Sequence, residues 1–199
     1  MSFSKALEKQ KIRSKYLAYR DYLTYPERVE KSKKIHEYLK ENVEFQNAGI
    51  LLVYMDYRSE VITTPLVEEM LASGDKRIFA PRVDGMDIRF YEIKSLDDLR
   101  SGYQNIREPL ADEAKCLSME EISAEKIFLL VPGSVFDKNM CRMGYGKGFY
   151  DRFLQKANHE NVTKAGLCFE CQLTKEIPVE EHDIRMDYIF TEKQILHKE

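Results

Sequence analysis

The stretch KIFLLVPGSVFDKNMCRMGYGKGFYDRFL, from Lys126 to Leu154, contains the pattern that decides the fold. It opens with an apolar run that does not alternate with polar residues, which is typical of a strand covered on both faces of a sheet. A long loop with a cluster of glycines follows, and then a helix that we expect from Lys147 to about Ala157. In open α/β sheets, ligands bind where such loops leave the carboxyl ends of the strands.

The same alternation of strands and helices extends outward over the chain. An apolar run at 48–55 suits a central strand, and a helix is expected at 63–74, with Thr64 as N-cap, Pro65 in the first turn and Gly74 at its end. We expect further strands and short helices at 76–83, 88–93, 163–170 and 186–192 (strands) and at 95–102 and 117–123 (helices). This order predicts a three-layer α/β fold, an open and mostly parallel sheet with helices on both faces.

Two helices are expected in the first forty residues, before the first strand. The first has apolar residues at roughly helical spacing, and lysines and arginines occupy its other faces; the apolar residues are Leu7, Ile12, Tyr16, Tyr19 and Leu23. No internal repeat or long linker interrupts the chain. The sequence therefore predicts a single domain of residues 1–199, in which residues 1–45 form an N-terminal helical arm packed on the body.

The composition is that of an ordinary globular protein. Hydrophobic residues make up 43% and charged residues 33% of the chain, as in ordinary globular proteins. The net charge of −3 offers no general attraction to nucleic acid or to an anionic membrane. Apolar runs are too short for a membrane span, and the first residues lack the apolar core of a signal peptide. We expect a cytoplasmic protein, a monomer or weak homodimer, that binds neither nucleic acid nor membranes.

Cys168 and Cys171 form a CxxC pair that could indicate a redox site or half of a zinc site. Tetrahedral zinc requires four ligands, and the sequence has neither a second CxxC nor an HxxxH pair to complete such a site. We therefore expect reduced, buried cysteines at the end of a strand.

The glycine cluster is typical of an anion site. Glycines permit positive φ angles and lack Cβ atoms, so backbone N–H groups can approach a phosphate closely, and the helix start adds partial positive charge. Arg142 and Lys147 add full charges between the glycines. The spacing matches neither a Walker A loop nor the dinucleotide fingerprint. A flexible hinge with solvated cations is the alternative interpretation.

Residues after the glycines have both structural and functional interpretations. Asp151 in the first helical turn favours the helix dipole, and beside a polyphosphate it could also hold Mg²⁺. Tyr145, Phe149 and Tyr150 could be core residues, or one could lie against a planar heterocycle at the edge of a polar cleft.

The stretch LLVPGSVFDKNMCRMGYGKGFYDRFL resembles the signature of 5-formyltetrahydrofolate cyclo-ligases, also called 5,10-methenyltetrahydrofolate synthetases. The resemblance covers most of the chain. KQKIR, from Lys9 to Arg13, is similar to the family's N-terminal K-x-x-x-R, and RSEVITTPLV, with Glu60 and Thr63, to its E-x-x-T segment. The segments APRV, IREPL and IPVEEHDIRMDYIFTE follow in the family's order.

The resemblance implies an α/β enzyme that uses ATP and Mg²⁺ to close 5-formyltetrahydrofolate to 5,10-methenyltetrahydrofolate, with release of ADP and phosphate. The formyl oxygen is phosphorylated, N10 attacks the activated carbon, and phosphate leaves. The implied residues are, for ATP, Lys9, Arg13, Arg142, Met143, Gly144, Tyr145, Gly146, Lys147, Gly148, Phe149 and Tyr150; for folate, Met55, Glu60, Tyr145, Gly146, Lys147, Gly148 and Phe149; for catalysis, Arg142 and Lys147; and for magnesium, Asp151 and Asp183, with Asp187 as the alternative to Asp183.

The chain departs from the family pattern at Met140, where glycine is common, and at Met143, where leucine is common. Methionine adopts positive φ less readily than glycine, so we expect the loop before Arg142 to take a somewhat different path. Two other functions stay open, a folate-binding protein without catalysis and a sugar-phosphate isomerase-like enzyme on the same kind of scaffold.

Overall fold

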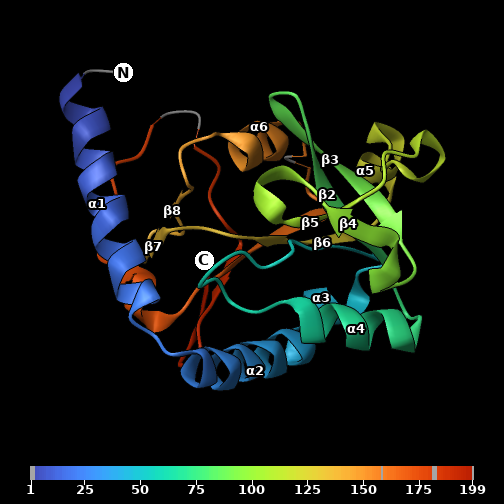
Figure 1. Ribbon diagram of the computed structural model, residues 1–199, viewed down its shortest axis with the longest axis horizontal. Coiled ribbons are helices and arrows are strands. Elements are labelled where there is room, and N and C mark those ends of the chain that lie inside the picture. The colour runs from blue at the N-terminus through green and yellow to red at the C-terminus, as the bar shows by residue number, and fades with distance from the viewer. Residues whose placement is uncertain (1–2, 158, 181–182, 199) are drawn as a thin grey trace.

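The computed structural model describes residues 3–157, 159–180 and 183–198, and its centre is a seven-stranded sheet (Figure 1). The strands in spatial order are β12 (Ile195–His197), β11 (Tyr188–Phe190), β9 (Val162–Leu167), β6 (Ile127–Val131), β1 (Ile50–Leu52), β2 (Arg77–Asp84) and β3 (Asp87–Ile93). The five from β11 to β2 are parallel, and β12 and β3 pair antiparallel at the two edges. The predicted open, mostly parallel sheet is confirmed.

The central strand β1 is much shorter than the apolar run that predicted it. Only three residues pair, and Leu51 lies in register between Ile78 of β2 and Phe128 of β6. Val53, Tyr54 and the next residue are buried without belonging to a strand. An apolar run indicates that residues are buried, not that they form a strand. Here residues 50–52 form the strand, and the buried residues 53–55 belong to the loop that follows it.

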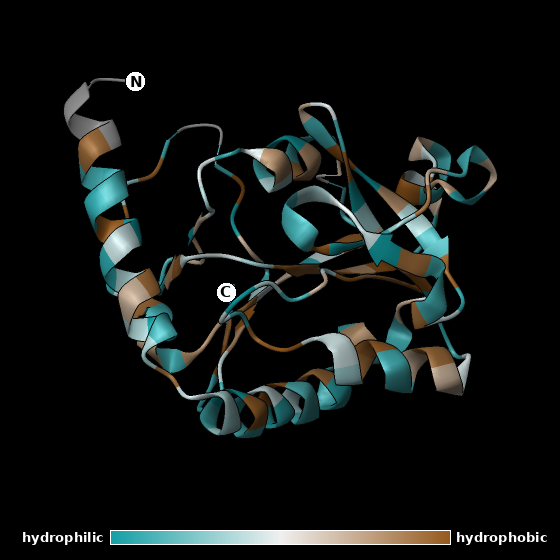
Figure 2. Cartoon of the chain, in the orientation of Figure 1, coloured by the Kyte–Doolittle hydropathy of each residue, from teal (hydrophilic) through white to brown (hydrophobic). Residues whose placement is uncertain are grey.

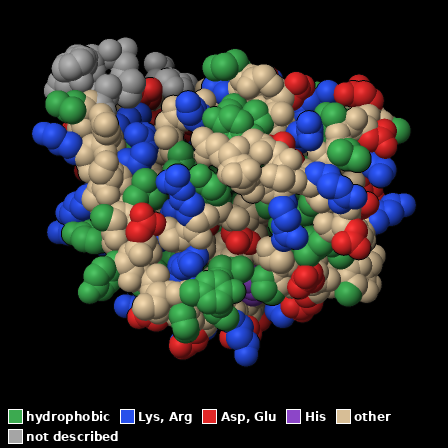
Figure 3. All heavy atoms as spheres, in the orientation of Figure 1, with side chains coloured by type: hydrophobic (Ala, Val, Ile, Leu, Met, Phe, Trp, Pro, Cys, Tyr) green, Lys and Arg blue, Asp and Glu red, His purple; other side chains and the backbone are tan. Residues whose placement is uncertain are grey.

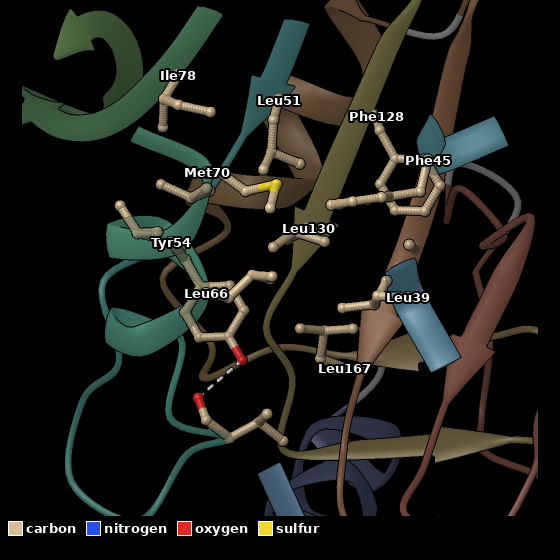
Figure 4. Close-up of a cluster of buried hydrophobic side chains, with 14 of the residues drawn as sticks. Leu39, Phe45, Leu51, Tyr54, Leu66, Met70, Ile78, Phe128, Leu130 and Leu167 are labelled. Carbon is tan, nitrogen blue, oxygen red and sulfur yellow. Dashed lines mark hydrogen bonds between the residues drawn. The ribbon is translucent and has the colours of Figure 1, made fainter. Parts of the chain in front are cut away.

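One face of the sheet is covered by α2 (Tyr25–Glu41), α3 (Val43–Asn47) and α4 (Thr64–Ser73), which lie below the sheet in Figure 1. Their apolar side chains form one cluster with the underside of the sheet, drawn in Figure 4: Leu39, Phe45, Leu66, Met70, Leu51, Ile78, Phe128 and Leu130. Tyr54 joins this cluster, and its hydroxyl donates to the Val61 carbonyl at 3.2 Å. Burial of such side chains contributes about 2 kcal/mol each.

The opposite face is covered by α5 (Met119–Ala124) and α6 (Phe149–Lys156). Ile122, Phe153 and Leu154 point into this second cluster, where the rings of Phe153 and Phe90 lie 4.6 Å apart. Figure 2 shows hydrophobic residues along the central strands between the two helical layers. The predicted three layers are confirmed.

Helix α1 (Phe3–Asp21) stands apart from both layers, whereas α2 packs on the sheet (Figure 1). Ile12 and Tyr16 of α1 pack on a cluster of Val135, Cys141, Met143 and Ile177. Much of that cluster lies on a small sheet of β10 (Leu173–Thr174), β7 (Val135–Asp137) and β8 (Arg142–Met143). Leu7 and Tyr19 are exposed, so the apolar face expected for this helix is only partly correct.

The start of α4 differs by one residue from the expectation. Thr63 is the N-cap, not Thr64, and it makes no side-chain cap bond, while Pro65 and Gly74 occupy the predicted start and end. The cap is supplied by Asp56, whose Oδ1 accepts from the backbone N–H groups of Thr63 at 3.0 Å and Thr64 at 3.2 Å. A carboxylate from the preceding loop thus replaces the local cap.

Two other expected helices are also corrected. The segment 95–102 forms a single 3₁₀ turn, Leu96–Asp98, and then strand β4 (Leu99–Ser101), which pairs with β5 (Arg107–Pro109). Helix α6 begins at Phe149, two residues later than expected, because Gly148 is left-handed at φ +72°. The remaining 3₁₀ turns are Tyr103–Asn105, Glu113–Lys115 and Glu170–Gln172.

Cys168 follows β9 directly and is buried, and Cys171 is partly buried; both are free thiols. Burial raises the pKa of both, which disfavours the reactive thiolate.

In the described part of the chain, none of the helices has the length and apolar character that crossing a bilayer requires. Positive and negative side chains are interspersed over the face shown in Figure 3.

Candidate active site

A pocket of about 390 Å³ opens at the carboxyl ends of the parallel strands. Its walls come from the loop after β1 (53–63), the segment after β6 (132–148, which includes β7 and β8), the start of α6, helix α1, strands β2 and β3, and the turn between β4 and β5. Strands β1 and β6 are neighbours whose chain connections run to opposite sides of the sheet, so the pocket lies at a topological switch point. The fold therefore brings together the two loops that the motifs indicated.

The glycines of the loop after β6 are required by its backbone. Gly146 has φ +95° and Gly148 has φ +72°, a region that side chains disfavour. At Gly144 a Cβ atom would lie 2.9 Å from Nη1 of Arg142. Two glycines thus serve the turn, and the third allows an arginine to pass beside the backbone.

Arg142 lies under this loop, and its side chain is only 3% exposed. Its guanidinium donates to the Asp151 carboxylate and, at 3.2 Å, to the Pro132 carbonyl. It also lies 6.0 Å from the centre of the Tyr150 ring. Asp151, in the first turn of α6 as predicted, is 43% exposed and lines the pocket. The buried cation is therefore compensated by a carboxylate that solvent can reach.

Lys147 lies in the loop and not in the helix, and its exposed side chain lines the pocket. Among the described residues, its ammonium group has neither a hydrogen-bond nor an ion-pair partner. Arg152 of α6 holds the loop in place, because it donates to the Lys147 carbonyl at 3.2 Å and to Asp87 of β3 at 3.1 Å. Lys147 is thus a free cation on a fixed backbone.

The predicted pair Lys9 and Arg13 on α1 separates into two roles. Arg13 Nε donates to the Gly144 carbonyl at 2.8 Å, and its guanidinium lies beside Gly146. Burial lowers the pKa of Arg13, and the negative charge of Asp151 opposes this. Lys9, one turn earlier, pairs with Glu180 at 3.5 Å and with Asp183 at 3.8 Å.

Glu60 is at the other end of the pocket and is 6% exposed. One of its oxygens accepts from the Tyr145 hydroxyl, and the other accepts from the Tyr57 backbone N–H at 2.9 Å. Burial raises the pKa of Glu60, while Arg20 and these hydrogen bonds lower it. Tyr145 of the glycine loop therefore contacts Glu60, a predicted folate-binding residue on the loop after β1.

Sequence reasoning missed Arg20, which is 1% exposed. Its Nε donates to Ser59 Oγ at 2.9 Å, and its Nη1 donates to the Tyr145 hydroxyl at 2.5 Å. Residues 9, 13 and 20 are separated by four and seven positions and so share one helical face. That spacing, added to the Lys9–Arg13 match, was the signal that could have revealed Arg20.

Apolar and aromatic side chains form much of the remaining wall. Met55 lines it as predicted, and Phe149 of α6 packs edge-on against Tyr103 with ring centres 5.8 Å apart. The Tyr150 side chain is partly buried, and its buried hydroxyl has no hydrogen-bond partner within the described residues. A pocket that combines apolar and aromatic side chains with a carboxylate at one end can accept a planar heterocycle that carries N–H donors.

The two predicted metal positions lie in different surroundings. Asp151 lines the pocket, whereas Asp183 lines a second cavity with Cys141 and Arg185. Asp187 accepts from the Lys164 N–H at 2.8 Å and pairs with its ammonium group. Nowhere in the described ranges do three histidine, cysteine or acidic side chains gather as a metal site would require. Asp151 thus offers a single carboxylate beside the glycine loop.

Met140 adopts the conformation that glycine would favour, with φ +65°. Its side chain is buried, its N–H donates to the Asp137 carbonyl, and its carbonyl accepts from Met186 at 2.8 Å. Asp137 also fixes the next residue by accepting from the Cys141 N–H at 3.0 Å. We expected methionine to avoid positive φ and so to change the path of the loop. Met140 adopts positive φ nevertheless, so the reason for expecting a different path does not hold. Met143 is buried in β8.

The fold and this site define an α/β enzyme class with a glycine-rich loop at the switch point. The model of the 5-formyltetrahydrofolate cyclo-ligase family matches residues 5–192, and the chain belongs to that family. Among curated relatives, the 5-formyltetrahydrofolate cyclo-ligase of Escherichia coli K12 is 29% identical over 151 residues, covering 74% of this chain and 80% of the relative. The enzyme of that name from Mus musculus is 28% identical over 178 residues, covering 85% and 86%.

Solved structures agree with this assignment. The structure of 5,10-methenyltetrahydrofolate synthetase from Aquifex aeolicus superposes with a TM-score of 0.82 at 32% identity and covers 95% of this chain and 92% of the other. That of the synthetase from Mycoplasma pneumoniae has a TM-score of 0.73 at 20% identity, with coverages of 93% and 99%, and supports the fold.

Proposed function

We propose that this protein converts 5-formyltetrahydrofolate to 5,10-methenyltetrahydrofolate with hydrolysis of ATP to ADP and phosphate. The observation that carries the proposal is the single pocket in which the glycine-rich loop of 144–148 meets Glu60 and Met55. Membership of the family supports the same reaction. The reaction requires a phosphoryl donor next to a planar folate, and the pocket has one end suited to each.

The glycine-loop end would bind the triphosphate. Backbone N–H groups of the loop approach the phosphates, Lys147 supplies a free positive charge, and Arg13 borders the loop from α1. Charge on a transferring phosphoryl group spreads over its oxygens, so cations aimed at those oxygens supply most of the catalysis. In this proposal Arg142 and Lys147 are the catalytic residues.

The Glu60 end would bind the folate. The Glu60 carboxylate accepts N–H donors of the pterin ring, Met55 and Phe149 cover its faces, and the formyl group points toward the glycine loop. The formyl oxygen then attacks the terminal phosphorus of ATP, and the bond from that phosphorus to the β-phosphate oxygen breaks, so that ADP leaves. N10 attacks the formyl carbon, which forms the five-membered ring, and N10 gives up its proton to solvent. The C–O bond to phosphate breaks, and phosphate leaves with both electrons of that bond.

Asp151 fits Mg²⁺ because it is an exposed carboxylate beside the phosphate loop, and magnesium in such sites takes one or two carboxylates plus phosphate oxygens. The ion would neutralise charge on the phosphates. Arg142 would then exchange its Asp151 partner for a phosphate oxygen. Asp183 as the second ligand stays a prediction, and so do Lys9 as an ATP contact and the single-domain, cytoplasmic, monomeric or weakly dimeric organisation.

The test is the appearance of the near-ultraviolet absorbance of 5,10-methenyltetrahydrofolate after purified protein is mixed with 5-formyltetrahydrofolate and MgATP. Product should require both ATP and magnesium and should form in a one-to-one ratio with ADP. Folded protein that binds the folate without turnover would indicate the non-catalytic alternative. Binding of a sugar phosphate with indifference to ATP would indicate the isomerase-like one.

A further inference from the structure

Arg20 is a buried cation on the pocket wall to which the proposed reaction assigns no role. Its neighbours along α1 include residues that are exposed to solvent, and it is the last-turn cation of the helix. Burying a guanidinium is unfavourable unless its charge and its N–H donors are satisfied. The groups that satisfy Arg20 therefore indicate what it is for.

Those groups belong to both functional loops. Arg20 Nε donates to Ser59 of the loop after β1, and Nη1 donates to the hydroxyl of Tyr145 in the glycine loop. The Tyr145 hydroxyl donates a hydrogen bond to the Glu60 carboxylate, and the Ser59 hydroxyl donates one to Asp21. One planar, rigid side chain thus fixes the distance between the two loops.

Arg20 also sets the charge around Glu60. The ionisable groups that face Glu60 come from α1, from the glycine loop and α6, and from its own loop; they are Arg20, Tyr145, Tyr150, Tyr54 and Asp56. Arg20 is the cation in this set. Burial and Asp56 raise the pKa of Glu60, and Arg20 opposes both.

We propose, on the basis of the function proposed above, that Arg20 is a positioning residue that holds the Tyr145 hydroxyl and the Glu60 carboxylate in the arrangement that binds the folate. It acts through these two groups and does not contact the reacting atoms. An arginine that only anchored α1 would affect stability and leave folate recognition by the folded protein unchanged.

The experiment compares Arg20→Met, Arg20→Lys and, as a control, Arg77→Met. Arg77 forms ion pairs with Glu92 at 2.8 Å and with Glu121 at 2.7 Å. It is the first residue of β2, whereas the pocket is lined by residues near the end of that strand. For each protein we would measure the Kd of 5-formyltetrahydrofolate without ATP from pH 5 to 8, and KM and kcat with MgATP. Unfolding curves would give the folded fraction.

We expect Arg20→Met to raise the Kd and the KM for folate about tenfold or more, because a charged hydrogen-bonded partner is lost. The acidic midpoint of folate binding should move to higher pH, since Glu60 loses its cation. Arg20→Lys should keep the wild-type midpoint and recover only part of the affinity, because one ammonium group cannot occupy both positions. The Arg77 variant should retain the wild-type Kd and midpoint.

An Arg20→Met protein that folds and binds folate with the wild-type Kd and midpoint would overturn the inference, and so would an effect confined to thermal stability. If Arg20→Met does not fold, Arg20→Lys, Tyr145→Phe and their double variant form a cycle. Non-additive losses of folate affinity would support the inference, and additive losses would overturn it. Wild-type protein that neither binds nor converts the folate would instead refute the proposed function.

Discussion

At the glycine-loop end of the pocket the compensating charges are open to solvent, whereas at the Glu60 end they are buried and bonded to one another. Asp151, which neutralises Arg142, is 43% exposed, and Lys147 is exposed. Arg20 and Glu60, by contrast, are 1% and 6% exposed and share the Tyr145 hydroxyl. Both ends are polar, but only one has charge that an incoming ligand can take over.

The difference indicates how each end would bind. Lys147 is exposed, and Asp151 stays in contact with solvent if Arg142 turns to a phosphate, so neither group incurs a large desolvation cost when a ligand binds. A buried network is expensive to disturb, because each group that loses its partner keeps its desolvation penalty. We therefore expect substitutions at the glycine-loop end to affect activity without stability, and substitutions at the Glu60 end to affect both.

The largest effect is expected for Lys147→Ala. Removal of a cation aimed at the transferring phosphoryl group should lower kcat/KM on the order of 100-fold or more. The free energy of unfolding should stay within about 0.5 kcal/mol of wild type, as for other surface substitutions. Steady-state kinetics and urea unfolding measure the two quantities. Lys156→Ala, an exposed lysine of α6 that pairs with Asp87, is the control and should retain activity; full activity in Lys147→Ala would remove the phosphate role.

Glu60→Gln should raise the KM for the folate about tenfold or more and leave the KM for ATP near its wild-type value. The amide keeps the shape of the carboxylate but presents N–H donors to the donors of the pterin and Tyr145. Kinetics with each substrate varied in turn separates the two constants. Equal changes in both KM values would contradict separate ends.

Glu60→Gln also tests how the charge of the buried Glu60 carboxyl affects the pH dependence of stability. Since the pKa of Glu60 is raised in the folded protein, this group stabilises the fold fully below its unfolded pKa, and the stability is lost as pH rises through the folded pKa. Glu60→Gln should remove that decrease. Urea unfolding between pH 4 and 8 gives the comparison, and parallel wild-type and variant curves would refute it.

Met140 tests the backbone before the glycine loop. Met140→Ala should destabilise the protein by about 3 kcal/mol through loss of a buried side chain. Met140→Gly should cost about 1 kcal/mol less, because only glycine relieves the strain of φ +65°. At Met186, a buried methionine without positive φ, glycine should instead be worse than alanine. Equal stabilities of the two Met140 variants in denaturant unfolding would exclude strain at this position.

The smallest effect is expected for Asp56→Ala in the loop after β1. Loss of the carboxylate that caps α4 should destabilise the protein by about 1 kcal/mol. Asp56→Asn keeps an acceptor oxygen and should lose less. If alanine and asparagine have the same unfolding midpoint in urea, the cap contributes nothing.

Much of the fold and the glycine-loop end could be predicted from sequence because local rules govern them. Apolar runs predicted the buried strands β1 and β6. The glycine cluster predicted a loop that permits positive φ, which Gly146 and Gly148 adopt and Gly144 does not. These features depend on backbone sterics and burial, which short stretches of sequence express directly.

The Glu60 end could not be predicted in the same way because its partners are distant in the chain. Arg20 bonds to Ser59, 39 positions away, and to Tyr145, 125 positions away. A helix face rich in lysine and arginine is expected to be exposed, and it is buried here only because tertiary structure supplies these partners. Asp56 displaced the expected Thr64 cap for the same reason. Leu7 and Tyr19 are exposed, because the inward face of α1 carries Arg13 and Arg20 as well as apolar residues.

The bonds between α1 and the glycine loop have a consequence for biosynthesis. Arg13 and Arg20 are translated early, but their partners Gly144 and Tyr145 follow 131 and 125 positions later. The cationic face of α1 therefore has no partner until the glycine loop has been synthesised. We expect the glycine loop to be among the last parts of the nascent chain to become ordered, and a ribosome-bound chain stopped before Gly144 to expose α1 to proteases.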